Sequence, residues 1–168
     1  LGNEAGIAGD LNNIGNVYSS WGQYDRALKY YEEVLAIDKK LGNEDSVAIS
    51  LNNIGHVYYS WGQYNKAIKY LEEGLAIAKK LGMEPDVALY LSNIGEAYSS
   101  LGQYDKALKY LEEALAKNKK LGLDDEIAIQ LNNIGMVYFA WGQYDKALKC
   151  FEEALAIDKR FGKESNTA

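Results

Sequence analysis

The chain has 168 residues, of which 48% are hydrophobic, and it carries a formal net charge of −6 with an isoelectric point near 4.9. This acidic balance argues against a surface for nucleic acids or anionic membranes, and no run of about 18 apolar residues could span a bilayer. The single cysteine, Cys150, forms no internal disulfide, which favours a reducing compartment, and we expect a cytoplasmic protein.

Four copies of one 40-residue unit make up the chain. The first copy contains Leu11-Asn12-Asn13-Ile14-Gly15, followed by Trp21-Gly22-Gln23-Tyr24. Closely similar segments return at positions 51, 91 and 131, and at positions 61, 101 and 141. A fixed period of this length is typical of a solenoid, in which each unit buries its apolar face only against its neighbours. We therefore expect a single array over residues 1–168, with repeats at about 5–42, 45–82, 85–122 and 125–162.

The two ends of the chain carry expectations of their own. Residues 1–4 read Leu-Gly-Asn-Glu, as do residues 41–44 at the end of the first complete repeat, and no initiator methionine precedes them. We therefore expect the chain to be a piece of a longer array, beginning with the tail of a missing helix. At the other end, we expect residues 163–168 to form a disordered tail.

The second repeat reads as two amphipathic helices. From about residue 45 to residue 60, apolar residues recur at three- and four-residue spacing, which predicts the first helix. Gly62 lies in the break that follows, where glycine permits the backbone angles of a tight turn. A second helix is predicted from about residue 63 to residue 81, ending with two lysines that suit the negative end of the helix dipole, and then Gly82. The four repeats therefore predict four helical hairpins.

Residues at fixed repeat positions predict how each hairpin packs. A glycine inside a helix costs about 1 kcal/mol relative to alanine, so its presence in every first helix needs a reason. We expect each of these glycines to lie close to an alanine of the following helix. The pairs are Gly15 with Ala27, Gly55 with Ala67, Gly95 with Ala107 and Gly135 with Ala147. Eleven of the fourteen tyrosines also occupy three fixed repeat positions, which predicts that they pack in the core.

These residues resemble the tetratricopeptide repeat, and all four copies carry the resemblance. In the second repeat it lies in Gly55, Tyr58, Gly62, Tyr64, Ala67, Leu71 and Leu75. Two departures stand out: Leu51 replaces the tryptophan often found in the family, and Lys79 replaces the closing proline, so the second helix runs on and the period exceeds the usual 34 or so. The longer form is similar to the repeats of kinesin light chains and spindle-orientation G-protein modulators, and to arrays that precede bacterial signalling domains. The resemblance implies an all-α fold, a right-handed α–α superhelix (solenoid) of four hairpins.

The resemblance also implies a binding surface, because the first helix of each tetratricopeptide hairpin lines the concave side of the superhelix. All lysines and arginines fall in or just beyond the second helices, and Glu96 is the one charged residue in the four stretches that correspond to residues 11–21. The candidate peptide-binding residues are an asparagine column, four variable positions and two aromatic residues. They are Asn13, Asn53, Asn93 and Asn133, then Asn16, His56, Glu96 and Met136, then Tyr59 and Phe139.

Asparagine is a mediocre helix former, because its amide competes with the backbone for hydrogen bonds, so four copies inside helices need an explanation. One hypothesis is a ladder of amides that bind the backbone of a peptide, as the resemblance implies. The alternatives are that the asparagines bond neighbouring helices within the array, or that they persist from recent duplication. The differences among the four variable positions likewise indicate either a surface tuned for a ligand or drift on an unused one.

We expect a protein-interaction scaffold that binds a peptide or partner segment, neutral to mildly basic and with apolar anchors, in the groove lined by the first helices. Tetratricopeptide domains that hold chaperone tails clamp the terminal carboxylate with basic residues on these helices, and none is present here, so we expect no such ligand. The alternative is a structural array, self-assembling or acting as a spacer, that stacks through uncapped terminal repeats. For that alternative the expected contact face is Ala147, Phe151, Leu155 and Ile157.

We expect no enzyme, no cofactor and no metal. His56 is the only histidine and lies more than two repeats from Cys150, so the pair cannot form a catalytic or metal site within one repeat. The recurring pair Glu32-Glu33 points about 100° apart on a helix, which suits a solvated face rather than acid/base chemistry. The glycines come singly and form no phosphate-binding loop.

Overall fold

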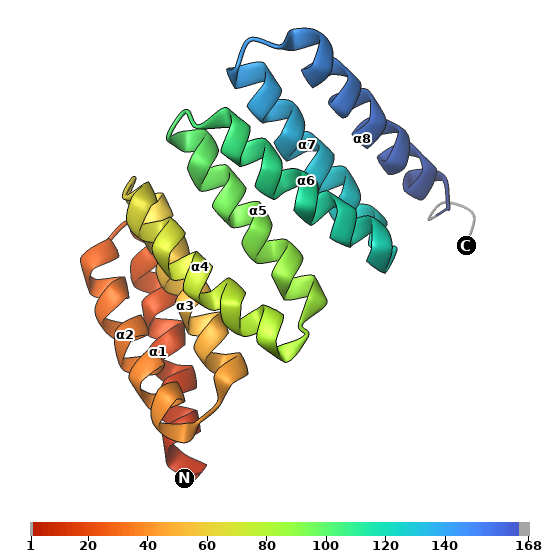
Figure 1. Ribbon diagram of the computed structural model, residues 1–168. Coiled ribbons are helices and arrows are strands. Elements are labelled where there is room, and N and C mark those ends of the chain that lie inside the picture. Colours follow the sequence, from red (N-terminus) through yellow and green to blue (C-terminus); the bar gives the residue numbers. More distant parts are fainter. Residues whose placement is uncertain (1, 165–168) are drawn as a thin grey trace. The chain divides into compact units, whose positions relative to one another are not determined.

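A computed structural model describes the backbone of residues 2–164, which form eight α-helices and no strand. The helices are α1 (Gly2–Ser20), α2 (Tyr24–Leu41), α3 (Glu44–Ser60), α4 (Tyr64–Leu81), α5 (Glu84–Ser100), α6 (Tyr104–Leu121), α7 (Asp124–Ala140) and α8 (Tyr144–Glu164). They fall into two compact units, unit 1 with α1–α4 and unit 2 with α5–α8, each made of two antiparallel hairpins (Figure 1). The expectation of an all-α chain of four hairpins is confirmed. The expected tail lies outside the described residues from residue 165 on, while residues 163 and 164 belong to α8.

Glycines in the left-handed region end the helices near the places that the sequence predicts. The observed bounds of α3 and α4 differ by one residue at most from the expected 45–60 and 63–81. Gly62 has a φ of 75° in the turn between them, and Gly82 has a φ of 70° after α4. Beyond Gly82, the Met83 N–H donates to the Ala78 carbonyl at 3.0 Å. This bond satisfies a carbonyl of the last helical turn, which would otherwise lack a partner.

The two helices of each hairpin cross at the glycine of the first helix. A Cβ atom added at Gly95 would lie 2.7 Å from Leu111 Cγ and 3.2 Å from the Ala107 carbonyl oxygen, so no side chain fits there without movement. The predicted alanine is therefore at the crossing, but the nearest atoms belong to a large side chain one turn further on. The reason is that helical side chains lean towards the N-terminus and cover the preceding turn. The equivalent large residues are Tyr31 at Gly15, Leu71 at Gly55 and Phe151 at Gly135.

Within each unit, the second helix of one hairpin packs on the first helix of the next. In unit 2, Leu108 of α6 forms a buried cluster with Ile134 and Val137 of α7. At one end of each junction, a tyrosine that begins a second helix contacts a tryptophan that follows the next first helix. These ring pairs are Tyr24–Trp61 in unit 1, with centroids 6.0 Å apart, and Tyr104–Trp141 in unit 2, with centroids 5.7 Å apart. The same interface is therefore built twice from equivalent residues.

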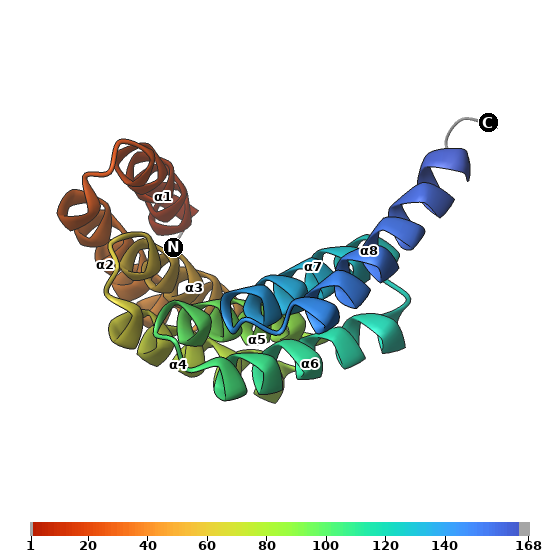
Figure 2. The ribbon, with the colours of Figure 1, turned by 90° about the horizontal axis from the view of Figure 1, so that it is seen from above.

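The outward face of α8 differs from the face that the sequence predicts. Figure 2 shows α8 at the edge of its unit, with α7 packed on one side. Of the four residues expected on the outward face, Ala147 is buried, and Phe151 packs back onto Gly135 of α7. Ile157 is half-buried against a cluster of α7 and α8 residues, and only Leu155 is exposed. The reason is that Ala147 and Phe151 lie at the crossing that closes the hairpin, on the side of α8 that faces α7.

Six of the tyrosines at fixed repeat positions pack in pairs inside the hairpins, where all but Tyr58 are half-buried, whereas Tyr144 at another of these positions is 64% exposed. Three stacked ring pairs join a first helix to its second helix, with centroids 5.4–5.5 Å apart. They are Tyr18–Tyr30, Tyr58–Tyr70 and Tyr98–Tyr110. In the fourth hairpin, Cys150 replaces the second tyrosine, and burial together with nearby carboxylates raises the pKa of its thiol. A raised pKa leaves less of the reactive thiolate at neutral pH, which agrees with a packing role for this residue.

An ion pair joins the far ends of each hairpin, between the last turns of the second helix and the start of the first. The N···O distances are 2.5–3.0 Å, in the pairs Lys40–Glu4, Lys80–Glu44, Lys117–Glu84 and Arg160–Asp124. All four lie at the surface, where such pairs contribute little to stability. Their regularity follows from the 40-residue period, because the acidic partner recurs at the same position of every repeat.

We expect Gly95→Leu to lower the free energy of unfolding by about 1–3 kcal/mol or more, because the added side chain overpacks the crossing against Leu111. The matched control is Gly6→Ala in α1, where a Cβ meets nothing within 4 Å. That change should stabilise the protein by up to about 1 kcal/mol through helix propensity alone. Urea unfolding followed by circular dichroism measures both variants. Unchanged stability of Gly95→Leu would contradict the crossing geometry.

The hydrogen bond from Lys117, aided by the charge of its ammonium group, lowers the pKa of the Glu84 carboxyl. The stabilisation from this pair is therefore present at neutral pH and is lost as the pH falls through that lowered pKa. We expect Lys117→Met to raise the pKa of Glu84 towards its ordinary value, as measured by NMR titration of the carboxyl carbon. Lys109→Met, which removes another exposed lysine of α6, serves as the control. A Glu84 pKa that responds equally to both changes would exclude the specific pair.

Candidate functional site

The candidate residues predicted from the sequence all lie on the first helices of the hairpins, α1, α3, α5 and α7. Five of them are exposed, namely Asn13, Asn16, His56, Met136 and Phe139. The other five are half-buried, namely Asn53, Tyr59, Asn93, Glu96 and Asn133. Only three of the ten, Asn93, Glu96 and Asn133, come together at one cavity. The site that the structure assembles is therefore smaller than the predicted surface.

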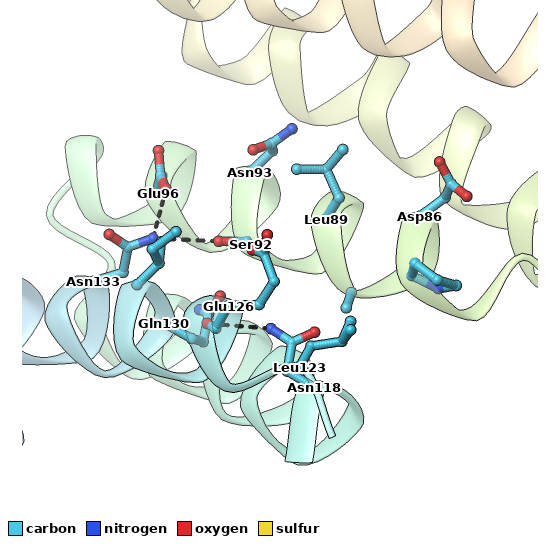
Figure 3. Close-up of a pocket in the computed structure, with 13 residues that line it drawn as sticks. Asp86, Leu89, Ser92, Asn93, Glu96, Asn118, Leu123, Glu126, Gln130 and Asn133 are labelled. Carbon is cyan, nitrogen blue, oxygen red and sulfur yellow. Dashed lines mark hydrogen bonds between the residues drawn. The ribbon is translucent and has the colours of Figure 1, made fainter. Parts of the chain in front are cut away.

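That cavity lies in unit 2 between α5 and α7 and has a volume of about 330 Å³. We call it the α5–α7 cavity and describe it by seven of its lining residues, Leu89, Ser92, Asn93 and Glu96 on α5 with Ile129, Gln130 and Asn133 on α7. Figure 3 shows the side chains of the two helices facing one another across it. Its wall combines amides and the carboxylates of Asp86, Glu96 and Glu126 with aliphatic side chains, a mixture typical of ligand sites.

Asn133 connects the two helices of the cavity. Its Nδ2 donates to Glu96 Oε1 at 2.8 Å and lies 3.3 Å from Ser92 Oγ (Figure 3). In unit 1 the equivalent Asn53 donates from Nδ2 to Asn12 Oδ1 at 3.0 Å. Both asparagines thus bond a neighbouring first helix, which is one of the alternatives that the sequence leaves open. These bonds use the NH2 donor groups of the two side-chain amides. The carbonyl oxygens of the same amides can accept hydrogen bonds, and this role does not use them.

Glu96 is an acidic residue at a half-buried position. Burial raises the pKa of its carboxyl, and the hydrogen bond from Asn133 opposes that rise in part. Burial destabilises the charged form because the carboxylate loses water, and a single amide donor replaces little of that hydration. A cation placed in the α5–α7 cavity would restore favourable interactions to this carboxylate.

Gln130 is a cavity residue that the sequence analysis did not select. Its side chain is 2% exposed, and its Nε2 meets no hydrogen-bond acceptor among the described residues. Leaving a buried donor unpaired costs about 1–3 kcal/mol, so such groups are rare. In the sequence, glutamine at this position differs from the serine and tyrosine of the two preceding repeats, but burial could not be read from that difference.

Three exposed aliphatic residues at one repeat position were also not selected by the sequence analysis. Ile49, Leu89 and Ile129 occupy one repeat position on the first helices and are 50–53% exposed. Two of them line the α5–α7 cavity. The sequence contained one sign of this position. Each of the three residues directly follows a buried valine–alanine or isoleucine–alanine pair, so it lies beside the buried stripe of its helix and not within it. Exposed aliphatic side chains at regular spacing offer apolar anchors to a ligand.

Unit 1 has an equivalent cavity of about 250 Å³ between α1 and α3. There the buried Ser50 Oγ donates to Asp38 Oδ2 at 2.7 Å. The residues at these two positions in unit 2 are Gln130 and Asn118, and Asn118 instead reaches the Glu126 carbonyl at 3.5 Å. The polar groups are thus paired in unit 1, whereas unit 2 retains an unpaired donor.

Neither of the two candidate aromatic residues is among those that line the α5–α7 cavity. Phe139 packs edge-on against Tyr144 with ring centroids 5.4 Å apart, and Tyr59 packs against Tyr64 at 5.5 Å. Each therefore covers the start of the following second helix as well as presenting a surface. Phe139 remains 55% exposed, so much of its ring is accessible to a partner.

Neither a metal cluster nor a membrane-spanning helix is found in the described part of the chain. No three histidine, cysteine, aspartate or glutamate side chains there gather closely enough to hold a metal ion. Among the described helices, none has the length and apolarity needed to cross a bilayer.

Comparisons with solved structures place the fold. BtubC (BKLC) from P. vanneervenii is 28% identical, with a TM-score of 0.82 over 92% of this chain and 64% of its own length. This chain therefore spans less than two thirds of that relative. The nearly identical repeats assigned to a kinesin light chain of Podosopora anserina are 23% identical, with a TM-score of 0.78 over 93% of this chain and 76% of theirs. The Rap conjugation gene regulator of plasmid pLS20, in complex with the Phr* peptide, is 24% identical, with a TM-score of 0.77 over 87% and 41%.

No curated protein matches the sequence. The family model of the tetratricopeptide repeat matches residues 8–80 and 86–160, which include all of α2, α3, α6 and α7 and most of α1, α4, α5 and α8. The match agrees with the four hairpins, the glycine crossings and the turn glycines observed in the structure. The chain belongs to the tetratricopeptide repeat family.

Proposed function

We propose that this chain is a protein-interaction scaffold that binds a peptide segment of a partner on the first-helix face of unit 2, with no catalytic role. The observation that carries the proposal is the α5–α7 cavity, which combines the unpaired Gln130 Nε2 with the half-buried Glu96 carboxylate. A ligand that satisfies both groups would recover the free energy that each loses through burial.

The chemistry of the cavity favours a peptide. A peptide backbone supplies carbonyl oxygens for Gln130 Nε2 and N–H donors for the side-chain carbonyls of Asn93 and Asn133. The exposed Leu89 and Ile129 side chains favour aliphatic or aromatic anchors on the ligand. Such a mixture of backbone contacts and apolar anchors is a common way to recognise an extended segment.

The charges favour a neutral or basic ligand over an acidic one. Glu96 lines the cavity, and α1, α3, α5 and α7 carry no lysine or arginine. A lysine or arginine of the ligand near Glu96 would form a charge-assisted hydrogen bond in a partly dry site. An acidic peptide would find no cation on these helices and would be repelled by Glu96.

The comparison with the Rap regulator supports the class of ligand. That protein has a similar fold and was solved in complex with a peptide. The likeness supports peptide binding by this fold, and the residues of the α5–α7 cavity support it for this chain.

To test the proposal, a displayed library of random peptides is selected on the purified chain. We expect the selected peptides to be enriched in lysine or arginine together with apolar residues. Glu96→Gln should weaken their binding by about tenfold, because it removes the charge-assisted hydrogen bond. Glu73→Gln, which neutralises an exposed carboxylate on α4, should leave binding unchanged.

The stability of both variants is measured in parallel, so that a loss of fold is not mistaken for a loss of binding. Selection of no peptide, or binding that Glu96→Gln leaves unaltered, would contradict the proposed site. Preferential selection of acidic peptides would overturn its electrostatic basis.

A further inference from the structure

Four residues of α5 form one stripe along the α5–α7 cavity. They are Asp86, Leu89, Asn93 and Glu96, and all four line the cavity. Their spacing of three, four and three residues places them on one face of the helix, and Figure 3 shows their side chains on the same side of α5. The stripe therefore has a carboxylate at each end, with an aliphatic side chain and an amide between them.

A carboxylate at both ends of this stripe is particular to α5. The residues at the two equivalent positions are Gly6 and Asn16 on α1, Ser46 and His56 on α3, and Glu126 and Met136 on α7. Glu126 lines the same cavity as the α5 stripe. Asn133 of α7 bonds Glu96 of α5, so equivalent positions of the two helices lie side by side, and Glu126 lies at the Asp86 end. The cavity thus has acidic groups at two separate ends.

The carboxylates at these ends are available to a cationic ligand. Asp86 and Glu96 are half-buried, and the four ion pairs at the hairpin ends use other carboxylates. The first helices α5 and α7 carry no lysine or arginine that could pair with them. A cation interacts more strongly with a half-buried carboxylate than with a fully exposed one, because less water screens the charges. A ligand with a positive charge at each end would therefore complement the cavity.

Gln130 determines which kind of dication fits. Its position is equivalent to residue 90 of α5, so it lies between the two acidic ends, and its buried Nε2 has no acceptor among the described residues. A polyamine has charges at both ends, but its protonated nitrogens are donors and would leave this group unpaired. A peptide with two basic side chains supplies both the charges and backbone carbonyl oxygens. The orphan donor therefore favours the peptide.

The length of the stripe sets the spacing of the two basic residues. Ten residues separate Asp86 from Glu96, and a helix rises about 1.5 Å per residue, so the two ends are about 15 Å apart. An extended peptide advances about 3.3 Å per residue, so four residues cover about 13 Å, and flexible basic side chains reach the rest. In an extended chain, residues two and four positions apart point to the same side. The residue midway between the basic ones therefore faces the exposed Leu89 and Ile129.

We propose that the α5–α7 cavity recognises an extended segment of a partner in which two basic residues stand four positions apart, with an aliphatic residue midway between them. This specificity rests on the peptide-binding function proposed above. One basic residue contacts Glu96, and the other contacts Asp86 and Glu126. The aliphatic residue packs on Leu89, and a backbone carbonyl of the segment accepts from Gln130 Nε2.

Displayed peptide libraries test the spacing on the unaltered chain. Each library fixes two lysines at one separation, from two to six positions, and leaves all other positions random. We expect the strongest enrichment at a separation of four, with aliphatic residues selected midway. Equal enrichment at every separation would overturn the proposed spacing and leave peptide binding intact. Enrichment from none of the libraries would contradict the proposed peptide-binding function itself.

A double-mutant cycle then tests which carboxylates the lysines contact. In one selected peptide, each lysine is replaced in turn by norleucine, which removes the charge, and affinity is measured by fluorescence anisotropy. Each replacement should weaken binding to the parent by about tenfold. On the Asp86→Asn, Glu126→Gln double variant, one of the two replacements should have no further effect. On Glu96→Gln, the other replacement should have none.

The matched control for this cycle is Asp125→Asn, which neutralises an exposed carboxylate beside Glu126 that does not line the cavity. Both lysines should keep their full effect on this variant. Thermal unfolding of every variant is measured in parallel, so that only folded proteins enter the cycle. Full effects of both lysines on the cavity variants, or effects lost equally on the control, would contradict the assigned contacts.

Discussion

The hairpins of this protein depend on one steric constraint, the close approach of a first-helix glycine to a large side chain of the second helix. At Gly95 the space for even a single Cβ is filled by Leu111, and the same arrangement recurs in every hairpin. Close approach brings the rest of each hairpin into contact, including the stacked tyrosines and the ion pair at the far end. The crossing buries one face of each first helix. The other faces can contact the neighbouring hairpin and, as we propose, a ligand.

The separation of these faces explains why the repeats tolerate change at some positions and not at others. The small residues at the crossings, such as Gly95 and Ala107, are the same in every repeat, whereas the position occupied by Glu96 is Asn16, His56 and Met136 elsewhere. The asparagine column has a structural role at Asn53 and Asn133, whose donor groups join neighbouring first helices. At Asn133 the acceptor is Glu96, a residue at a position that varies between repeats.

Periodicity predicted the helices and their bounds, because burial at three- and four-residue spacing is a local property of the chain. The family was predicted from the resemblance of the repeated residues to a known motif. Two features of the site could not be read in that way. The burial of Gln130 and the lack of an acceptor for its Nε2 depend on how the neighbouring helices pack around it. The face of α8 was assigned wrongly for a related reason. Small and large residues at fixed spacing marked an apolar stripe, but only the structure distinguishes the side that closes the hairpin from the side that is exposed, around Tyr144 and Leu148.

We propose that the residues that build the hairpins and those that contact a ligand are different sets. The most direct measurement places first-repeat residues at three variable positions of unit 2, as Glu96→Asn, Met136→Asn and Phe139→Ser, copying Asn16 and Ser19. Thermal unfolding and binding of library-selected peptides are then measured on the same triple variant. We expect a cooperative melting transition close to that of the parent, with only the small loss from the Phe139–Tyr144 contact and the Asn133–Glu96 hydrogen bond, together with lost binding. A variant that unfolds, or one that binds the peptides as well as the parent, would contradict the claim.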